Sequence, residues 1–358
     1  MRYIILFIIA ILLPVFGFLN FAQNDEKGAS RAKEKTASIS FVRSAAEEIS
    51  ADADLAPDAD AQNAKYKIPE IQYTGPSNFP LGTTISQPYL ENFKSPNFFP
   101  IRNWDVKIEN ADAASTLVLE PVTQKAIQHK NIFDVRPIAS LTKLMTAFVV
   151  IEDMNLASEV VVSENAVASY GDQGNLAPRE VLRVEDLLYI LLIESSNDAA
   201  IALEEYYNAY RTEQDRTFVA AMNQKARELG LLDTFFVEPS GLNINNRSTA
   251  YDLARLADYV FQRPILREIL STQVIDVQSQ DGLVNHHLVN SNKLLGVLKG
   301  VLAGKTGYTE EAGESLVLFV KKSENIDDYL IYVILGSPDR VKVARHLIDW
   351  VDRAYIWK

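Results

Sequence analysis

The sequence predicts an α+β fold in which an antiparallel sheet is flanked by helices and a helical subdomain is inserted into the chain. Three observations support this prediction. Segments with the two-residue period of strands occur near residue 115 and again after residue 300. The helical period fills the region between them, and an amphipathic helix closes the chain. Strands from both ends of the domain would therefore complete a single sheet.

A change of period marks the first strands and the first helix. Residues 115–119 and 125–129 are predicted to form two short strands around a turn. Apolar residues then recur at i, i+3, i+4 and i+7, which predicts a helix that buries one face: Leu141, Leu144, Met145 and Phe148. Helical patterning continues from there to about Tyr259.

The clearest helical segments of this middle region are residues 184–207 and 216–231. The strand period returns in residues 315–320 and 329–335, which we expect to pair as a hairpin. Residues 341–356 are predicted to form the closing amphipathic helix, with one apolar face made by Ala344, Leu347, Ile348 and Val351.

The first 22 residues are predicted to be a signal peptide or a membrane anchor. Arg2 precedes the uncharged apolar run 3–19, which is at the short end of the roughly 17–25 residues that span a bilayer. No Ala-x-Ala cleavage signal ends this run, which favours the anchor. With Arg2 on the cytoplasmic side, the rest of the chain would be extracytoplasmic, either membrane-anchored or secreted.

Residues 23–103 have the composition of a disordered tether. Residues 44–60 are acidic, and a stretch without periodicity follows that is interrupted by Pro69, Pro76, Pro80, Pro88, Pro96 and Pro100. Such a segment has too little apolar surface to offset the entropy of ordering it. The folded domain is therefore predicted to comprise residues 104–358.

Composition argues against several classes of function. A net charge of -12 and an isoelectric point of about 5.0 disfavour nucleic acid as a partner. The absence of cysteine removes thiol nucleophiles, disulfides and thiolate metal sites. We expect neither a metal nor another cofactor, since no histidine spacing is typical of zinc among His129, His286, His287 and His346.

Three short motifs occur in order along the predicted domain: Ser140-Leu-Thr-Lys143, Ser195-Ser-Asn197 and Lys305-Thr-Gly307. The first two are weak signals taken singly, because Ser30-Arg-Ala-Lys33 and Ser163-Glu-Asn165 also match them. Lys-Thr-Gly is rarer. Its position after the other two indicates that the three motifs form one functional set.

Each motif lies where its side chains can act. Ser140 opens a helix after Pro137, so its hydroxyl lies near free backbone N–H groups. Lys143 follows one turn later, which brings its amine beside that hydroxyl. A strand edge at residues 305–307 would present an ammonium, a hydroxyl and bare backbone to a peptide lying alongside. The alternatives are a simple N-cap at Ser140 and a plain turn at residues 305–307.

The three motifs resemble the signature of the low-molecular-mass penicillin-binding proteins, serine D-alanyl-D-alanine carboxypeptidases that share it with β-lactamases. Ser196 departs from the pattern, because glycine or alanine is commoner there. The resemblance implies a β-lactamase/DD-peptidase-like fold. It covers about residues 112–355 and includes further segments at 139–147, 191–200, 238–242, 292–295 and 304–313.

The resemblance implies catalytic roles for Ser140, Lys143 and Ser195 and a substrate-binding role for Asn197. Ser140 would attack the carbonyl between two D-alanines to form an acyl-enzyme, and a neutral Lys143 would take its proton. Burial and the nearby charge of Lys305 would both lower the pKa of Lys143. Ser195 would relay a proton to the leaving D-alanine, and Asn197 would hold the substrate amide and Lys143.

Other matching residues would bind the substrate. Lys305 and Thr306 would hold its terminal carboxylate side, next to the bare backbone of Gly307. The backbone N–H groups of Tyr308 and of the nucleophile would form an oxyanion hole. Arg340 matches a family position proposed to help hold the carboxylate, which suits a guanidinium fork.

The predicted activity is hydrolysis of the terminal D-alanine of peptidoglycan stem peptides, with β-lactam antibiotics as covalent inhibitors and the cytoplasmic membrane as a further partner. A DD-endopeptidase with the same machinery is the alternative, since the chain ends at Lys358 without the C-terminal β-domain of many carboxypeptidases. A β-lactamase needs a deacylating base. Glu204-Glu-Tyr-Tyr-Asn208 has a suitable spacing, but it shares a helical stretch with Ser195 and is interpreted as a solvated helix face. Complete motifs disfavour a non-catalytic wall-binding or penicillin-sensor module.

Overall fold

The computed structural model describes residues 100–108, 111–168, 175–210 and 217–357. The predicted signal peptide or anchor, residues 1–22, lies outside the described residues. So does the predicted tether, residues 23–103, except for its last four residues. The domain boundaries therefore stay a prediction. Within the described ranges, no helix combines the length and the apolar character needed to cross a membrane.

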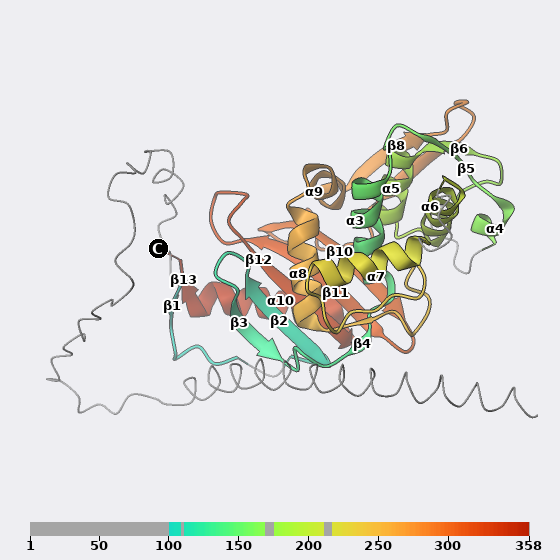
Figure 1. The fold of residues 1–358 in the computed structure, drawn as a ribbon. Helices are drawn as coiled ribbons and strands as arrows, with labels where there is room; N and C mark the ends of the chain where they lie inside the picture. Colours follow the sequence, from blue (N-terminus) through green and yellow to red (C-terminus); the bar gives the residue numbers. More distant parts are fainter. Residues whose placement is uncertain (1–99, 109–110, 169–174, 211–216, 358) are drawn as a thin grey trace, which may run out of the picture. The chain divides into compact units, whose positions relative to one another are not determined.

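A five-stranded antiparallel sheet forms the centre of the described part (Figure 1). Its strand order is β10-β11-β12-β2-β3, so the N-terminal hairpin pairs with strands from the C-terminal part of the chain. The strands are β2 (Ser115–Glu120), β3 (Lys125–Lys130), β10 (Val301–Thr309), β11 (Gly313–Lys321) and β12 (Tyr329–Ser337). Both predicted hairpins and the α+β fold class are confirmed.

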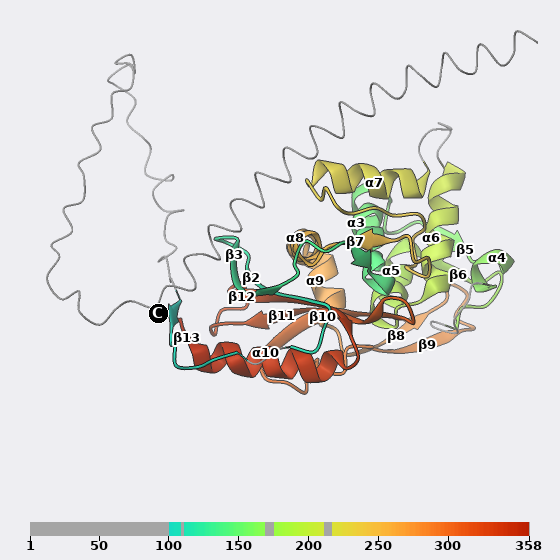
Figure 2. The same ribbon diagram turned by 90° about the horizontal axis from the view of Figure 1, so that it is seen from below.

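Helices cover both faces of this sheet, which explains why its strands are apolar almost throughout. On one face, Val118 and Tyr332 pack with α10 (Arg340–Ala354). On the other face, Leu117 and Phe319 pack with the remaining helices. Figure 2 shows α10 on one side of the sheet and α8 (Ala250–Phe261) and α9 (Pro264–Ser271) on the opposite side. Phe261 stacks on Phe319 at 4.0 Å, which fastens α8 to the sheet.

The inserted helical region lies beyond the edge strand β10 (Figure 1). It contains a 3₁₀ turn η1 (Ala139–Thr142), then α3 (Lys143–Asp153), α4 (Glu164–Val167), α5 (Val184–Ile193), α6 (Asn197–Tyr210) and α7 (Phe218–Glu228). Two-stranded ladders accompany the helices: β1 (Ile101–Arg102) with β13 (Tyr355–Ile356), β4 (Arg136–Pro137) with β7 (Arg247–Ser248), β5 (Glu159–Val161) with β6 (Val181–Arg183), and β8 (Val274–Gln278) with β9 (Asn285–Val289).

The structure differs from the predicted elements in two places that matter. Residues 184–207 form two helices rather than one, because Ser195 between α5 and α6 adopts a left-handed φ of 68°. A non-glycine residue adopts this conformation only when its surroundings impose it. The closing helix ends at Ala354 rather than at residue 356, since its last two predicted residues pair with β1 instead.

Candidate active site

The Ser140 hydroxyl and the Lys143 amine meet at the start of α3. Ser140 lies in the 3₁₀ turn η1, after Ala139, whose φ of 47° turns the chain sharply. Lys143 is the first residue of α3 and is fully buried. Its Nζ lies 3.0 Å from Ser140 Oγ, within hydrogen-bonding range. The predicted proximity of these two groups is therefore what the structure shows.

The Lys143 amine has two further partners. Nζ donates to Oδ1 of Asn197 at 2.8 Å and to the carbonyl oxygen of Ser240 at 2.5 Å. Complete burial lowers the pKa of Lys143 from 10.5 to about 7, against a smaller upward push from the Glu238 carboxylate. At neutral pH, a substantial fraction of the amine is therefore unprotonated and able to accept a proton.

The second buried amine belongs to Lys305 on β10. Its Nζ donates to Ser195 Oγ at 2.7 Å and to the carbonyl of Thr306 at 3.1 Å. Burial first, and then the charges of Lys143 and Arg340, hold the pKa of Lys305 well below its usual range. Sequence reasoning expected burial and the Lys305 charge to lower the pKa of Lys143. Burial does lower it, and the repulsion between the two amines lowers the pKa of Lys305.

The break between α5 and α6 presents the second motif to both amines. Ser195 and Asn197 are almost fully buried, one facing Lys305 and the other Lys143. Ser196, between them, turns away from the site, and its Oγ accepts the backbone N–H of Ala199 at 3.1 Å. It acts as an N-cap for α6. A hydroxyl at this unusual position therefore has a local structural explanation.

Strand β10 and the turn η1 approach each other closely at Gly307. A Cβ on Gly307 would lie 3.1 Å from the backbone nitrogen of Ser140 and 3.2 Å from the carbonyl oxygen of Ile138. A methyl group here would therefore force the two segments apart by a few tenths of an ångström. The neighbouring Tyr308 is 60% exposed. Its N–H lies on the same strand, next to the close contact, and its part in an oxyanion hole stays a prediction.

Sheet register explains why Lys305 points into the helical region. Lys305 pairs with Val317, Val317 with Val333, and Val333 with Leu117 across the sheet. Directly paired residues share a face. The three apolar partners belong to the core on the face that α8 covers, opposite α10. The Lys305 side chain therefore leaves the sheet toward the helices that carry the other motifs.

Two more side chains contact β10 at the predicted substrate-binding segment. The Thr306 hydroxyl lies 2.8 Å from Ser291 Oγ, a residue that sequence reasoning did not single out. Arg340, the first residue of α10, donates from Nη1 to the carbonyl of Gly307 at 2.8 Å. Arg340 is thus brought to the same strand as Lys305, although β11 and β12 lie between them in the chain.

The loop that supplies the Ser240 carbonyl was missed as part of the site. Residues 238–242 were noted only as a family-like segment, without a role. Gly241 has a φ of 91°, and a Cβ there would lie only 2.1 Å from the carbonyl oxygen of Ala139. The Pro-Ser-Gly sequence after a glutamate was the available signal, because it indicates a tight turn that needs a positive φ.

Glu204 does not fit its predicted place on a solvated helix face. It is only partly exposed, and burial first, then the carboxylates of Glu238 and Glu205, raise its pKa to about 7. The Glu238 carboxylate of the loop at residues 238–242 is therefore close enough to act on Glu204 electrostatically. Asn208, at the other end of this spacing, is exposed, so the segment lies partly on a solvated face.

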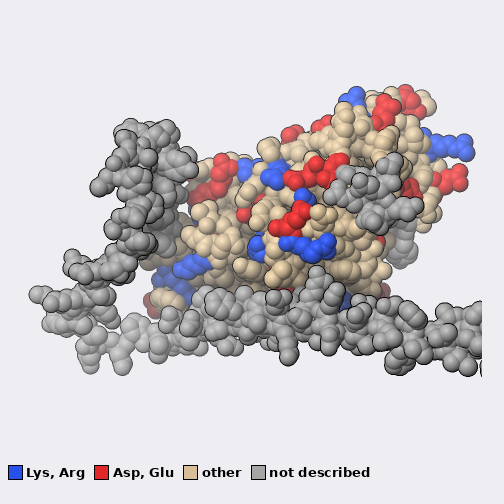
Figure 3. Space-filling view, in the orientation of Figure 1, with Lys and Arg blue, Asp and Glu red and all other residues tan. Residues whose placement is uncertain are grey.

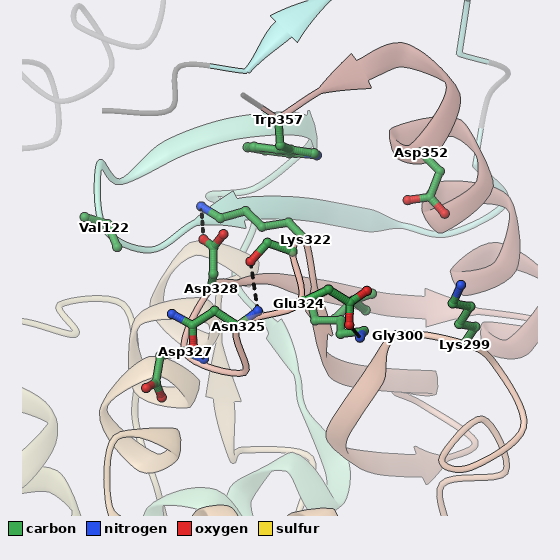
Figure 4. Close-up of a pocket in the computed structure, with 13 residues that line it drawn as sticks. Val122, Lys299, Gly300, Lys322, Glu324, Asn325, Asp327, Asp328, Asp352 and Trp357 are labelled. Atoms are coloured by element: carbon green, nitrogen blue, oxygen red, sulfur yellow. Dashed lines mark hydrogen bonds and ion pairs between the residues drawn. The ribbon is translucent and has the colours of Figure 1, made fainter. Parts of the chain in front are cut away.

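A separate hollow of about 820 Å³ lies away from the three motifs (Figure 4). Its walls come from the segments 299–300, 320–325 and 327–328, together with Val122, Asp352 and Trp357. Lys322 pairs there with Glu120 at 2.9 Å and Asp328 at 2.8 Å. None of the predicted site residues lines it. On the face seen in Figure 3, basic and acidic side chains are interspersed.

Comparison with known sequences points to one family. The sequence profile of the D-alanyl-D-alanine carboxypeptidases matches residues 103–339. The D-alanyl-D-alanine carboxypeptidase DacF of Bacillus subtilis is 34% identical over 250 residues, which is 68% of this chain and 63% of the relative. A D-alanyl-D-alanine endopeptidase of Pseudomonas aeruginosa is 31% identical over 248 residues, covering 68% of this chain and 78% of that protein.

Solved structures show the same fold. A D-alanyl-D-alanine carboxypeptidase from Mycobacterium tuberculosis matches with a TM-score of 0.63 and 26% identity, over 72% of this chain and 98% of that chain. A Streptomyces DD-transpeptidase matches with a TM-score of 0.63 and 26% identity, over 69% of this chain and 100% of the other. The predicted DD-peptidase-like fold is confirmed.

Proposed function

We propose, because this chain belongs to the D-alanyl-D-alanine carboxypeptidase family, that it hydrolyses the terminal D-alanine of peptidoglycan stem peptides. The observation that carries the proposal is that two buried lysine amines each hydrogen-bond to a serine hydroxyl. Lys143 Nζ lies 3.0 Å from Ser140 Oγ, and Lys305 Nζ lies 2.7 Å from Ser195 Oγ. This arrangement supplies a nucleophile with an adjacent base and a second hydroxyl for proton transfer.

Acylation begins when neutral Lys143 takes the proton of Ser140 Oγ, which attacks the carbonyl between the two D-alanines. As the C–N bond breaks, Ser195 passes its proton to the leaving nitrogen and regains one from the Lys143 ammonium, which returns to its neutral form. The net proton transfer is from Ser140 to the free D-alanine. Water then attacks the ester with Lys143 again as the base, and the Lys143 ammonium returns the proton to Ser140 Oγ as the acyl–oxygen bond breaks and the shortened stem peptide leaves. Asn197 holds the Lys143 amine in place through its 2.8 Å hydrogen bond.

Substrate binding is assigned to the β10 edge. Lys305, Thr306 and Arg340 would receive the terminal carboxylate beside the backbone of Gly307. Burial lowers the pKa of Lys305, and an arriving carboxylate would reverse that effect by favouring the ammonium form. The N–H groups of Tyr308 and of Ser140 would stabilise the oxyanion of the tetrahedral intermediate. No cofactor takes part in these steps.

The substrate also sets the location. Peptidoglycan lies outside the cytoplasmic membrane, so we assign the chain to the cell envelope, where β-lactam antibiotics would acylate Ser140. Residues 1–22 would hold it at the membrane and residues 23–103 would serve as the tether. The apolar run after Arg2 is what supports this assignment.

A DD-endopeptidase is the second candidate. It is favoured by relatives named as endopeptidases from Pseudomonas aeruginosa, Escherichia coli and Haemophilus influenzae, which are 31%, 31% and 30% identical. Both activities cleave a bond to the same D-alanine carbonyl and use the same serine chemistry. They differ in whether the leaving group is free D-alanine or a cross-linked neighbouring stem.

Labelling followed by product analysis tests the proposal. Full-length protein should bind a fluorescent penicillin covalently, and the Ser140→Ala variant should not. Defined muropeptides analysed by mass spectrometry then separate the candidates: free D-alanine from pentapeptides supports the carboxypeptidase, whereas cleavage confined to cross-linked dimers supports the endopeptidase. A wild-type protein that neither labels nor cleaves would favour a non-catalytic wall-binding module.

A further inference from the structure

The carboxylate of Glu238 organises the loop beneath the Lys143 amine. Its Oε2 accepts the backbone N–H of Ser240 at 2.6 Å and the hydroxyl of that residue at 2.5 Å. Its Oε1 accepts the N–H of Gly241 at 2.7 Å, the side-chain amide of Asn246 at 2.6 Å and the N–H of Asn243 at 3.3 Å. One carboxylate therefore gathers five donors from residues 240–246.

The same loop is fastened to the nucleophile segment at several points. The Ser240 carbonyl accepts the Lys143 amine at 2.5 Å. The carbonyl of Pro239 accepts the Thr146 hydroxyl at 2.6 Å, which ties the loop to α3. Gly241 packs directly against the backbone of Ala139. Any shift of this loop would consequently move an acceptor of Lys143 and the surface behind Ser140.

We propose that Glu238 is a positioning residue for acylation, whose carboxylate holds the loop so that the Ser240 carbonyl stays on the Lys143 amine. The inference rests on the proposed function in one respect, namely that Lys143 is the base. Glu238 touches neither the nucleophile nor the substrate-binding strand in any of these contacts, so it acts through Ser240. All five partners donate to Glu238, and four of them are backbone or amide N–H groups, which can only donate. Both side-chain oxygens must therefore be acceptors, as they are in a carboxylate.

The charge of Glu238 also bears on the base. It raises the pKa of Lys143, in opposition to burial. The other charged groups in this environment are Lys305, whose pKa Lys143 and Arg340 depress, and Glu204 on α6, whose pKa burial, Glu238 and Glu205 raise to about 7. Removing the Glu238 charge should lower the pKa of Lys143, so that the amine becomes neutral at lower pH.

These two effects give the substitution a recognisable signature. Acylation needs neutral Lys143, so its rate rises with pH through the pKa of that amine and then levels off. In Glu238→Gln the rising limb should move to lower pH. The plateau should fall by about tenfold or more, because the amide presents N–H groups to donors and the loop loses its fixed geometry. If Glu238 had only a structural role, the rising limb of the pH–rate profile would stay at its wild-type position.

The experiment measures the second-order rate constant for acylation of the full chain by a fluorescent penicillin, from about pH 5.5 to about pH 9. Glu238→Asp keeps the charge with a shorter reach and should leave the limb at its wild-type position with a reduced plateau. Glu324→Gln is the matched control, since this side chain is 95% exposed and pairs only with Lys321 in the contacts of the described residues. Its profile should coincide with that of wild type.

An unmoved limb in Glu238→Gln, even with a lower melting temperature, would overturn the inference. If that variant does not fold, Glu238→Asp decides: a reduced plateau supports the inference and a wild-type plateau overturns it. Wild-type acylation that depends on Ser140 shows that the proposed function stands whatever the Glu238 variants do. Absence of wild-type acylation would overturn both.

Discussion

Burial of the Lys143 amine should make the stability of this protein depend on pH in a defined window. The pKa of Lys143 falls from an ordinary value of 10.5 to about 7 in the folded state, and desolvation is the cause. Between these values the unfolded chain binds a proton that the native chain does not. The free energy of unfolding therefore rises with pH across this window, by up to about 1.4 kcal/mol per pH unit.

Replacing Lys143 with methionine removes this proton-binding site. Between about pH 7 and about pH 9, the stability of the wild type relative to Lys143→Met should increase by about 2 kcal/mol. The methionine also leaves the Ser240 carbonyl and Asn197 Oδ1 without this donor, at a cost of about 1–3 kcal/mol each. That cost does not depend on pH. It therefore shifts the whole stability-against-pH curve of Lys143→Met relative to that of wild type, without changing how far the two curves separate between pH values.

Urea unfolding followed by circular dichroism, on full-length wild type and variant at about pH 7, 8 and 9, measures the divergence. Lys125→Met, at an exposed position on β3, is the control and should run parallel to wild type. Parallel curves for Lys143→Met as well would refute the reasoning, because they would mean that the native Lys143 amine titrates as it does in the unfolded chain.

Three further substitutions probe the packing around the site. Gly307→Ala places a methyl group 3.1 Å from the Ser140 nitrogen, so penicillin acylation should slow by about 100-fold with an unchanged circular dichroism spectrum; a wild-type rate would show that β10 and η1 separate freely. Ser196→Ala removes the α6 cap and should lower stability in urea by about 1 kcal/mol, and equal midpoints would argue against the capping role. Phe319→Ala breaks the 4.0 Å stack on Phe261 and should reduce the unfolding free energy by about 3–5 kcal/mol, whereas a loss below about 1 kcal/mol would mean that the core refills the space.

Periodicity was sufficient for four of the five strands of the sheet. The alternating segments that became β2, β3, β11 and β12 carry apolar residues that pack on both faces, so their pattern reports burial directly. The motif residues were also identifiable, because a serine with a lysine one turn later is a statement about adjacent residues on one helix. Their catalytic roles stay predictions.

Two features were not recognised for different reasons. The α5–α6 break falls at Glu194-Ser-Ser196, which contains neither glycine nor proline, and both flanking segments keep a helical period. The left-handed φ of Ser195 is imposed by its surroundings and has no local signature. The β8–β9 hairpin, by contrast, carries an Asp281-Gly282 turn between alternating segments, which is a local signal that could have predicted it.

Residue order alone settles which chemical groups are present, which elements carry them and which family they resemble, because these properties depend on near neighbours in the chain. The proton affinity of the base depends on groups that are distant in sequence. Lys143 contacts Asn197 across 54 positions and Ser240 across 97, and Lys305 contacts Ser195 across 110. Only packing in three dimensions removes water from these two amines, and desolvation is what makes Lys143 able to accept a proton near neutral pH.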